Sequence, residues 1–426
     1  MEGQVRTQRA MPQQSSTPVS ILICSTVVVG IGAGIGGTLL ALLLRTVQHL
    51  AYGYSPWHLV SNETFLEGVR AASPIRRVLV LSLCGIIAGF GWWLLYRYGK
   101  PLLSIEEALK KKAHMPKAAT MIHVLLQIIT VGLGSPLGRE TAPREFGAVF
   151  ADWFSNKIGL SPRDAKIMLA CGAGAGLAAV YNVPLGGAIF TLEVLLVTIE
   201  WSILLRAFAT SVIAVLISWL GLGNHPQYQI ATYELNHSLL LWSVLCGPVF
   251  GVAAYWFNYL VNGARRNAAR NWQLPVLCFI NFLMIGFLAA FFPAILGNGK
   301  SPAQLEFDAA LTLGASLSLL ALRVGITWST LRAGGRGGIL TPALANGSLL
   351  AAVLGGLWNL YLPGSSLNAY ALIGAAAFLA ASQKMPLTAI ILIFEFTHIK
   401  FSFLVPILLA VTGAVGLFRL CDARCK

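Results

Sequence analysis

The chain has few charged residues for its length. Only 11% of its 426 residues are Asp, Glu, Lys or Arg, whereas 56% are hydrophobic, and the mean hydropathy is +0.72. Soluble domains usually carry about 25% charged residues, so this composition excludes a soluble globular protein. Apolar segments of roughly 20 residues, the length that crosses a bilayer, recur along the chain. We therefore predict an all-α polytopic membrane protein.

Motifs for metal binding, disulfides and catalysis are missing. The seven cysteines are scattered, and Cys421 and Cys425 have no histidine or further ligand beside them, so we expect neither disulfides nor a metal site. The sequence has no His-Glu metal spacing, Gly-x-Ser-x-Gly elbow or Asp pair. Gly299-Lys300-Ser301 resembles the end of a phosphate-binding loop, but position 294 is alanine where that loop requires glycine. We predict no enzyme, no catalytic residue, no cofactor and no nucleotide site.

Acidic residues are outnumbered by basic ones. The chain has 16 Asp and Glu against 30 Lys and Arg, a net charge of +14. In a membrane protein, basic residues gather in cytoplasmic loops and contact anionic lipid, so we expect the lipid bilayer as a partner and no nucleic acid. Arg6 and Arg9 precede the first apolar segment, and Arg419, Arg424 and Lys426 end the chain. We therefore expect both termini in the cytoplasm.

The chain contains an internal repeat. Residues 172–193 and 374–395 match at an offset of 202, and both contain small residues, a Pro-Leu pair and a glutamate eight residues after the leucine. Gly138 and Thr141 match Gly338 and Thr341 at an offset of 200. Interrupted segments at matching positions in two halves point to a binding site near the bilayer midplane. We predict a polar tail at 1–19, membrane repeats at 20–226 and 237–422, a polar joint at 227–236 and a short tail at 423–426.

Each repeat contains a predicted helix break. Arg139 and Glu140 lie between two apolar blocks, and charged groups at membrane depth usually mark a pathway for ions or protons. Gly138 and Gly338 each precede a new helix. Helix N-termini bind anions through unpaired N–H groups and a partial positive charge, and glycine allows close approach of a solute. The two breaks predict an anion site, although each motif alone also fits a tightly packed helix start.

These motifs resemble those of the CLC family of chloride channels and proton-coupled chloride exchangers. GRETAP at 138–143 and GILTP at 338–342 resemble the G-(K/R)-E-G-P and G-x-F-x-P loops, and 98–109 weakly resembles a third motif. Residues 178–193 and 380–397 resemble the paired helices around those loops. The resemblance implies two inverted-topology repeats of tilted and re-entrant helices, without cytoplasmic regulatory domains. It also implies a homodimer in a bacterial inner membrane that transports chloride or a similar small anion together with protons.

The resemblance also implies roles for individual residues. Glu140 falls on the gating glutamate, whose carboxylate occupies an anion site when it is ionised and leaves when it is protonated or displaced. This group then couples protons to anions, and an ion pair with Arg139 or Arg144 is the structural alternative. Candidate anion-binding residues around the two loops are Gly138, Arg139, Gly338, Ile339 and Leu340.

Two positions depart from the family pattern. Lys100 falls where the family has a serine that contacts the central anion, so Lys100 is a further candidate anion ligand; alternatively it ends a span and extends to the interface. Val194 falls where proton-coupled members carry an inner glutamate. A Glu106–His123 contact would titrate near neutral pH. Candidates for the proton path are Glu193, Glu200, Glu106 and His123.

The sequence favours proton-coupled anion exchange over a passive channel because Glu140 is present. Val194 favours the channel, as does the lack of a pore tyrosine near the C-terminal end. Ile339 stands where some fluoride exporters carry glutamate, which argues against fluoride specialisation. An intramembrane enzyme using Glu140, Glu193 or His123 is a distant alternative.

Overall fold

The computed structural model describes residues 17–53, 63–111, 113–230, 233–362 and 364–424. Arg6, Arg9, Cys425 and Lys426 lie outside these ranges, as do most of the predicted N-terminal tail and part of the predicted joint. Over the described ranges the regular structure is helical, and the one β-type pairing is an isolated bridge between Gly138 and Gly338.

The first half of the chain forms helices of very unequal length, because glycine and proline interrupt the apolar segments. The π-helical segment η1 directly follows α8. These elements are α1 (Val19–Tyr52), α2 (Phe65–Ala71), α3 (Pro74–Tyr98), α4 (Ile105–Lys111), α5 (Lys117–Gly132), α6 (Thr141–Lys157), α7 (Pro162–Tyr181), α8 (Pro184–Phe190), η1 (Thr191–Leu196) and α9 (Trp201–Leu222).

The second half begins with α10 and contains two short 3-10 segments, η2 and η3. Its elements are α10 (His237–Arg266), α11 (Gln273–Phe291), η2 (Pro293–Ile295), α12 (Lys300–Phe307), α13 (Leu313–Ala333), α14 (Leu340–Asn359), α15 (Leu367–Gln383), α16 (Pro386–Thr397), η3 (Phe401–Phe403) and α17 (Leu404–Arg424).

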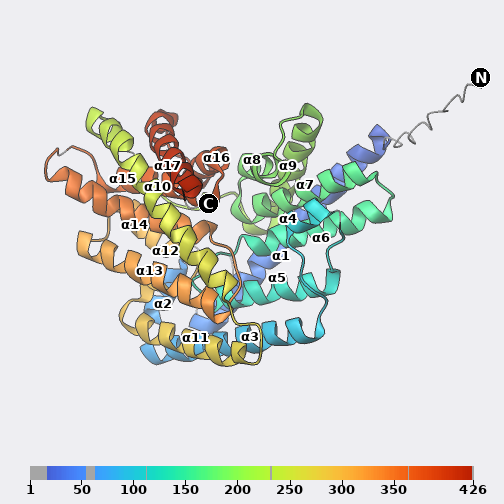
Figure 1. The fold of residues 1–426 in the computed structure, drawn as a ribbon, viewed down its shortest axis with the longest axis horizontal. Helices are drawn as coiled ribbons and strands as arrows, with labels where there is room; N and C mark the ends of the chain where they lie inside the picture. Colours follow the sequence, from blue (N-terminus) through green and yellow to red (C-terminus); the bar gives the residue numbers. More distant parts are fainter. Residues whose placement is uncertain (1–16, 54–62, 112, 231–232, 363, 425–426) are drawn as a thin grey trace, which may run out of the picture.

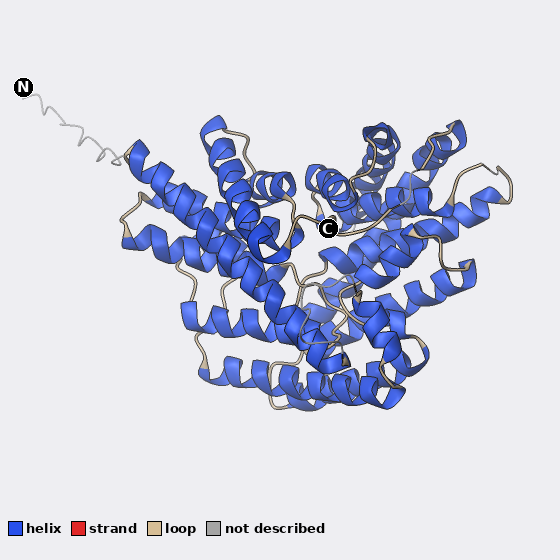
Figure 2. Ribbon diagram, turned by 180° about the vertical axis from the view of Figure 1, so that it is seen from behind, coloured by secondary structure: helices blue, strands red, loops and turns tan. Residues whose placement is uncertain are grey.

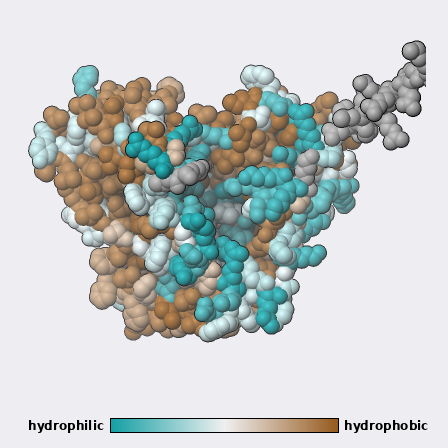
Figure 3. Space-filling view, viewed as in Figure 1, coloured by the Kyte–Doolittle hydropathy of each residue, from teal (hydrophilic) through white to brown (hydrophobic). Residues whose placement is uncertain are grey.

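Eight helical segments within the described ranges are long and apolar enough to cross a membrane. They are α1, α3, α7, α9, α10, α11, α14 and the segment Phe401–Arg424. The sequence composition had predicted spans of this kind, and α5, α15 and α16 are shorter apolar helices between them. Hydrophilic side chains gather in the centre of the face shown in Figure 3, and hydrophobic side chains cover its left part.

The two halves of the chain lie side by side. In Figure 1 most blue-to-green helices occupy the right of the molecule and most yellow-to-red helices the left. Figure 2 shows the molecule from behind, as helices joined by loops. At the bottom, α3 packs along α11, so a helix of one half contacts a helix of the other. The loops between α5 and α6 and between α13 and α14 meet at the centre of this arrangement, as the Gly138–Gly338 bridge requires.

Equivalent glycines allow equivalent helix pairs to pack closely. A Cβ on Gly147 of α6 would lie 2.0 Å from the carbonyl oxygen of Gly172 on α7. In the second half, a Cβ on Gly347 of α14 would lie 2.5 Å from the carbonyl oxygen of Gly374 on α15. Small residues at membrane helix interfaces permit this close approach of backbones. The packing holds α6 and α14, the helices that follow the two breaks, in matching positions.

Each half also caps a helix of the other. Glu193 in η1 accepts hydrogen bonds from the backbone N–H groups of Leu387 (2.9 Å) and Thr388 (2.7 Å) at the start of α16. Glu395 in α16 accepts from the N–H groups of Leu185 (2.8 Å) and Gly186 at the start of α8. These carboxylates satisfy N–H groups that a helix start leaves unpaired. The glutamates that matched in sequence are therefore partners in a reciprocal contact.

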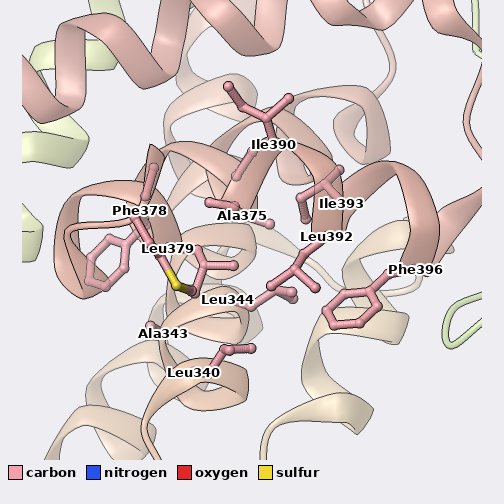
Figure 4. Close-up of a cluster of buried hydrophobic side chains, with 14 of the residues drawn as sticks. Leu340, Ala343, Leu344, Ala375, Phe378, Leu379, Ile390, Leu392, Ile393 and Phe396 are labelled. Atoms are coloured by element: carbon pink, nitrogen blue, oxygen red, sulfur yellow. The ribbon is translucent and has the colours of Figure 1, made fainter. Parts of the chain in front are cut away.

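The N-terminal turn of α14 rests on a buried apolar cluster. Figure 4 shows Leu340, Ala343 and Leu344 of α14 beside side chains of α15 and α16. These α14 residues are at most 3% exposed. The cluster fixes the position and direction of α14, and with them the direction in which its first N–H groups point.

Candidate anion site

The two helix breaks form one structural unit. Gly138 N–H donates to the carbonyl oxygen of Gly338 at 2.7 Å, and Gly338 N–H donates to the carbonyl oxygen of Gly138 at 2.9 Å. The pairing is antiparallel. It joins the loops that precede α6 and α14, and it brings together the residues that the sequence had placed at equivalent breaks.

The Glu140 side chain occupies the N-terminus of α14. Its Oε1 atom accepts a hydrogen bond of 2.6 Å from the backbone N–H of Leu340, and the residue is 1% exposed. The positive end of the helix dipole stabilises a carboxylate there as it would a bound anion. The acidic group thus occupies a place that suits a small anion.

Two hydroxyl groups complete the binding site around the Glu140 carboxylate, which we call the seat. The hydroxyls of Tyr181 and Thr341 lie 3.0 Å apart, and they lie 3.3 and 3.4 Å from Oε2 of Glu140. Both residues are buried. Hydroxyl donors are suited to holding either a carboxylate or a small anion.

A basic pocket borders the seat. Its lining includes Arg139 and Lys300, and it also includes Tyr181 and Thr341, which contact Glu140. The Arg139 guanidinium lies 5.0 Å from the ring centre of Tyr181 and donates to the Gln227 side chain at 3.3 Å. The Arg139 cation beside the pocket raises the local concentration of anions, whereas burial and the positive charges of Arg139 and Arg45 lower the pKa of Lys300 to about 7.

Arg323 supports the loop beneath the seat. This residue of α13 is fully buried, and its guanidinium donates to the carbonyl oxygens of Ile295 (2.8 Å), Gly297 (2.6 Å) and Pro136 (3.3 Å). Pro136 belongs to the same loop as Gly138. The buried cation therefore fixes the loop and adds positive potential near the carboxylate.

Residues 84–419 match the family model described as voltage gated chloride channel. The chain belongs to this family. The ClcB voltage-gated chloride channel of Escherichia coli O81 is 30% identical over 390 residues, which cover 86% of this chain and 90% of the relative. The ClcB protein of Citrobacter koseri is 28% identical over 386 residues, which cover 86% of this chain and 90% of the relative.

Solved structures with this fold include transporters of the same family. A slow cyanobacterial Cl⁻/H⁺ antiporter aligns with a TM-score of 0.79 at 19% identity, over 96% of each chain. A CLC-type fluoride/proton antiporter aligns with a TM-score of 0.68 at 21% identity, over 94% of this chain and 98% of its own. The CLC-like all-α fold expected from the sequence is confirmed.

Some predicted site residues lie away from the seat. Lys100 follows the end of α3 and is exposed, and within the described ranges it forms no hydrogen bond or ion pair with Glu140. Glu106 is exposed on α4. His123 of α5 is buried, but its partners are Trp92 and Glu145 rather than Glu106.

The other two candidates for the proton path have partners of their own. Glu193 is half-buried and holds the start of α16, as described above. Glu200 is exposed and pairs with Arg163 at 2.8 Å. Val194, which the sequence resemblance aligns with the inner glutamate of proton-coupled members, is half-buried among apolar neighbours.

Tyr181, Thr341 and Lys300 were not recognised as site residues in the sequence. Tyr181 lies within the repeated segment, but position 383, its counterpart in the other half, is glutamine, so the repeat gave no signal. Thr341 stands out in the sequence only as part of the repeat. The Gly299-Lys300-Ser301 pattern indicates no anion role, and the fold places Lys300 beside Arg139.

Proposed function

We propose that this protein transports chloride or a similar small anion across the membrane by proton-coupled exchange, with Glu140 as the gate. The observation that carries the proposal is the Glu140 carboxylate at the N-terminus of α14, bonded to Leu340 N–H. An anion and an ionised carboxylate compete for the same N–H and hydroxyl donors. Protonation weakens the hold of these donors on Glu140, so a proton on the carboxyl group admits an anion to the seat.

The other parts of the site have roles consistent with this cycle. The pocket with Arg139 and Lys300 concentrates anions on one side of the gate. Gly138 and Gly338 keep side chains out of the seat, and Tyr181 and Thr341 supply donors. A passive anion channel of the same fold is the second candidate function. The observation that favours it is the apolar side chain of Val194.

We further propose a homodimer in a bacterial inner membrane with both termini in the cytoplasm. Membership of the family motivates the dimer, and the bacterial relatives motivate the location. The basic residues near both ends of the chain motivate the orientation.

Replacement of Glu140 tests the gate. In liposomes with a chloride gradient, Glu140→Gln and Glu140→Ala should keep anion efflux but lose coupled proton uptake and its pH dependence, because neither side chain titrates. Loss of a positioned proton carrier lowers proton movement by about 100-fold or more. The control is Glu107→Gln, an exposed carboxylate that pairs with Lys111. An unchanged pH profile in the Glu140 variants would remove this residue from the mechanism, and anion flux without proton movement in the unaltered protein would favour the channel.

A further inference from the structure

A second buried carboxyl group lies on α6, one and a half helical turns beyond Glu140. Glu145 is 9% exposed, and its Oε2 atom accepts a hydrogen bond of 2.9 Å from the side-chain amide of Gln127. The Nε2 atom of His123 lies 3.8 Å from the same oxygen. Trp92 of α3 donates from its indole N–H to Nδ1 of His123 at 2.9 Å. Three helices thus bring together a polar cluster that the anion seat does not use.

The tryptophan fixes the protonation state of the histidine. An indole N–H can only donate, so Nδ1 of His123 must be unprotonated when this bond is formed. The imidazole is then neutral, and its single proton is on Nε2, which faces Glu145. His123 therefore turns its N–H toward Glu145 at an N···O distance of 3.8 Å, longer than a hydrogen bond, and carries no full positive charge.

Gln127 can serve both forms of Glu145. The residue is fully buried, and its Oε1 atom has no hydrogen-bond partner in the described part of the chain. Its amide N–H₂ donates to an ionised Glu145 carboxylate. After a half-turn of the amide, Oε1 accepts from a protonated Glu145 carboxyl group. The cluster can therefore hold Glu145 with or without its proton.

Opposing influences act on the charge of Glu145. Burial disfavours the ionised form, whereas the positive charges of Arg144 and Arg336 favour it. The charge of Arg144 also acts on Glu140. The charge of Arg336 also acts on His123, and its Nε donates to the half-buried Tyr96 near the end of α3 at 2.9 Å.

We propose that Glu145, held by Gln127 and lying beside the neutral His123, is the inner proton-exchange site that serves Glu140 in this chain. The inference rests on the proposed proton-coupled function. In the transfer step, the O–H bond of Glu145 breaks, and water in the pathway carries the proton to the Glu140 carboxylate, where a new O–H bond forms. Glu145 then takes a proton from bulk water. The two carboxyl groups are five residues apart, an axial rise of about 7.5 Å.

The other carboxylates near the expected inner position have structural partners. Glu193 accepts hydrogen bonds from three donors at the start of α16, and Glu200, which directly precedes α9, is paired with Arg163. Release of Glu193 for proton transfer would leave these donors unpaired. Glu145 has a neutral hydrogen-bond partner, Gln127, that suits both of its forms.

The test measures chloride efflux and proton uptake together in reconstituted liposomes. Glu145→Gln should leave chloride efflux unchanged and lower proton uptake by about 100-fold, because the amide cannot carry a proton. Gln127→Leu, which removes the bond that holds Glu145, should also lower proton uptake and shift its pH profile. The matched control is Glu306→Gln, a carboxyl group of α12 that is 1% exposed and lies outside the cluster. This control should keep full coupling.

The outcomes separate this inference from the proposed function. If the unaltered protein moves chloride without protons, the exchange mechanism itself is wrong. If it couples the two fluxes and both the Glu145 and Gln127 variants keep full proton uptake, the assignment of Glu145 is overturned. If Glu145→Gln protein is aggregated on size-exclusion chromatography, Gln127→Leu decides the matter alone: reduced proton uptake with normal chloride efflux supports the site, and normal uptake overturns it.

Discussion

At the scale of single residues, the seat depends on glycines, which have no side chain, as much as on the side chains around it. Gly138 and Gly338 provide the paired backbone, and Glu140 lies against both of them. The Leu340 N–H is free to bind Glu140 because the carbonyl it would face in a continuous helix is missing at a helix start. Small changes at these glycines should therefore affect the carboxylate directly.

Gly338→Ala should impair transport. A Cβ at this position would lie 2.0 Å from Oε1 of Glu140 and 2.3 Å from its Cδ, so the carboxyl group must leave. The same methyl group occupies space that an anion needs, and overpacking of this kind costs about 1–3 kcal/mol. We expect chloride efflux to fall by about tenfold or more. Gly325→Ala on α13, where a Cβ meets nothing within 4 Å, is the control. Efflux at the normal rate from the Gly338 variant would contradict the described seat.

At the scale of helices, the reciprocal caps link the two halves. Pro184 and Pro386 begin α8 and α16, and each helix start receives a glutamate from the other half. Asn182 and Lys384, which end α7 and α15 just before these prolines, both adopt a left-handed conformation, with φ of 57° and 56°. The two turns therefore share backbone geometry although their sequences differ.

Loss of a cap should destabilise the fold. Glu193→Ala leaves the N–H groups of Leu387 and Thr388 without their charged acceptor, at a cost of about 1–3 kcal/mol. Glu395→Ala should cost a similar amount, because its bonds are equivalent. Glu200→Ala removes an exposed ion pair worth less than about 1 kcal/mol. Thermal unfolding in detergent measures all three. A stable Glu193→Ala protein that has lost proton coupling would instead place Glu193 on the proton path.

At the scale of the whole molecule, α8 and α16 each expose a leucine at the same position of the repeat. Leu185 is 47% exposed and Leu387 is 53% exposed. The two helices pack against each other. In a two-fold symmetric dimer the same patch of each subunit faces its copy, and we expect α8 and α16 to form this patch.

Leu185→Trp together with Leu387→Trp should weaken the proposed dimer, because the added bulk would separate two matched surfaces without introducing charge. Leu39→Trp on α1, where the leucine is 60% exposed, is the control. Cross-linking in native membranes measures the dimer, and we expect it to decrease only in the double variant. An undiminished dimer would place the interface elsewhere.

Much of the site was predictable because its backbone geometry requires particular residues. The helix breaks need glycine, and a charged group at membrane depth needs a function, so Gly138, Glu140 and Gly338 were recognised in sequence. Tyr181 was not, because a tyrosine near the end of an apolar helix has no distinctive pattern. His123 was recognised, but its contact was expected with Glu106, whereas the packing of α5 on α6 gives it Glu145.

The sequence by itself determined the membrane class, the family, the duplicated helix breaks and the acidic residue at the first of them. These properties depend on composition, local backbone preference and short spacings, all of which are visible along one chain. Only the tertiary structure decided which donors surround Glu140, that Glu193 and Glu395 serve as caps, and that Glu145 joins Gln127 and His123. Those contacts join residues on different helices, and the packing of the helices against one another sets the distances between them.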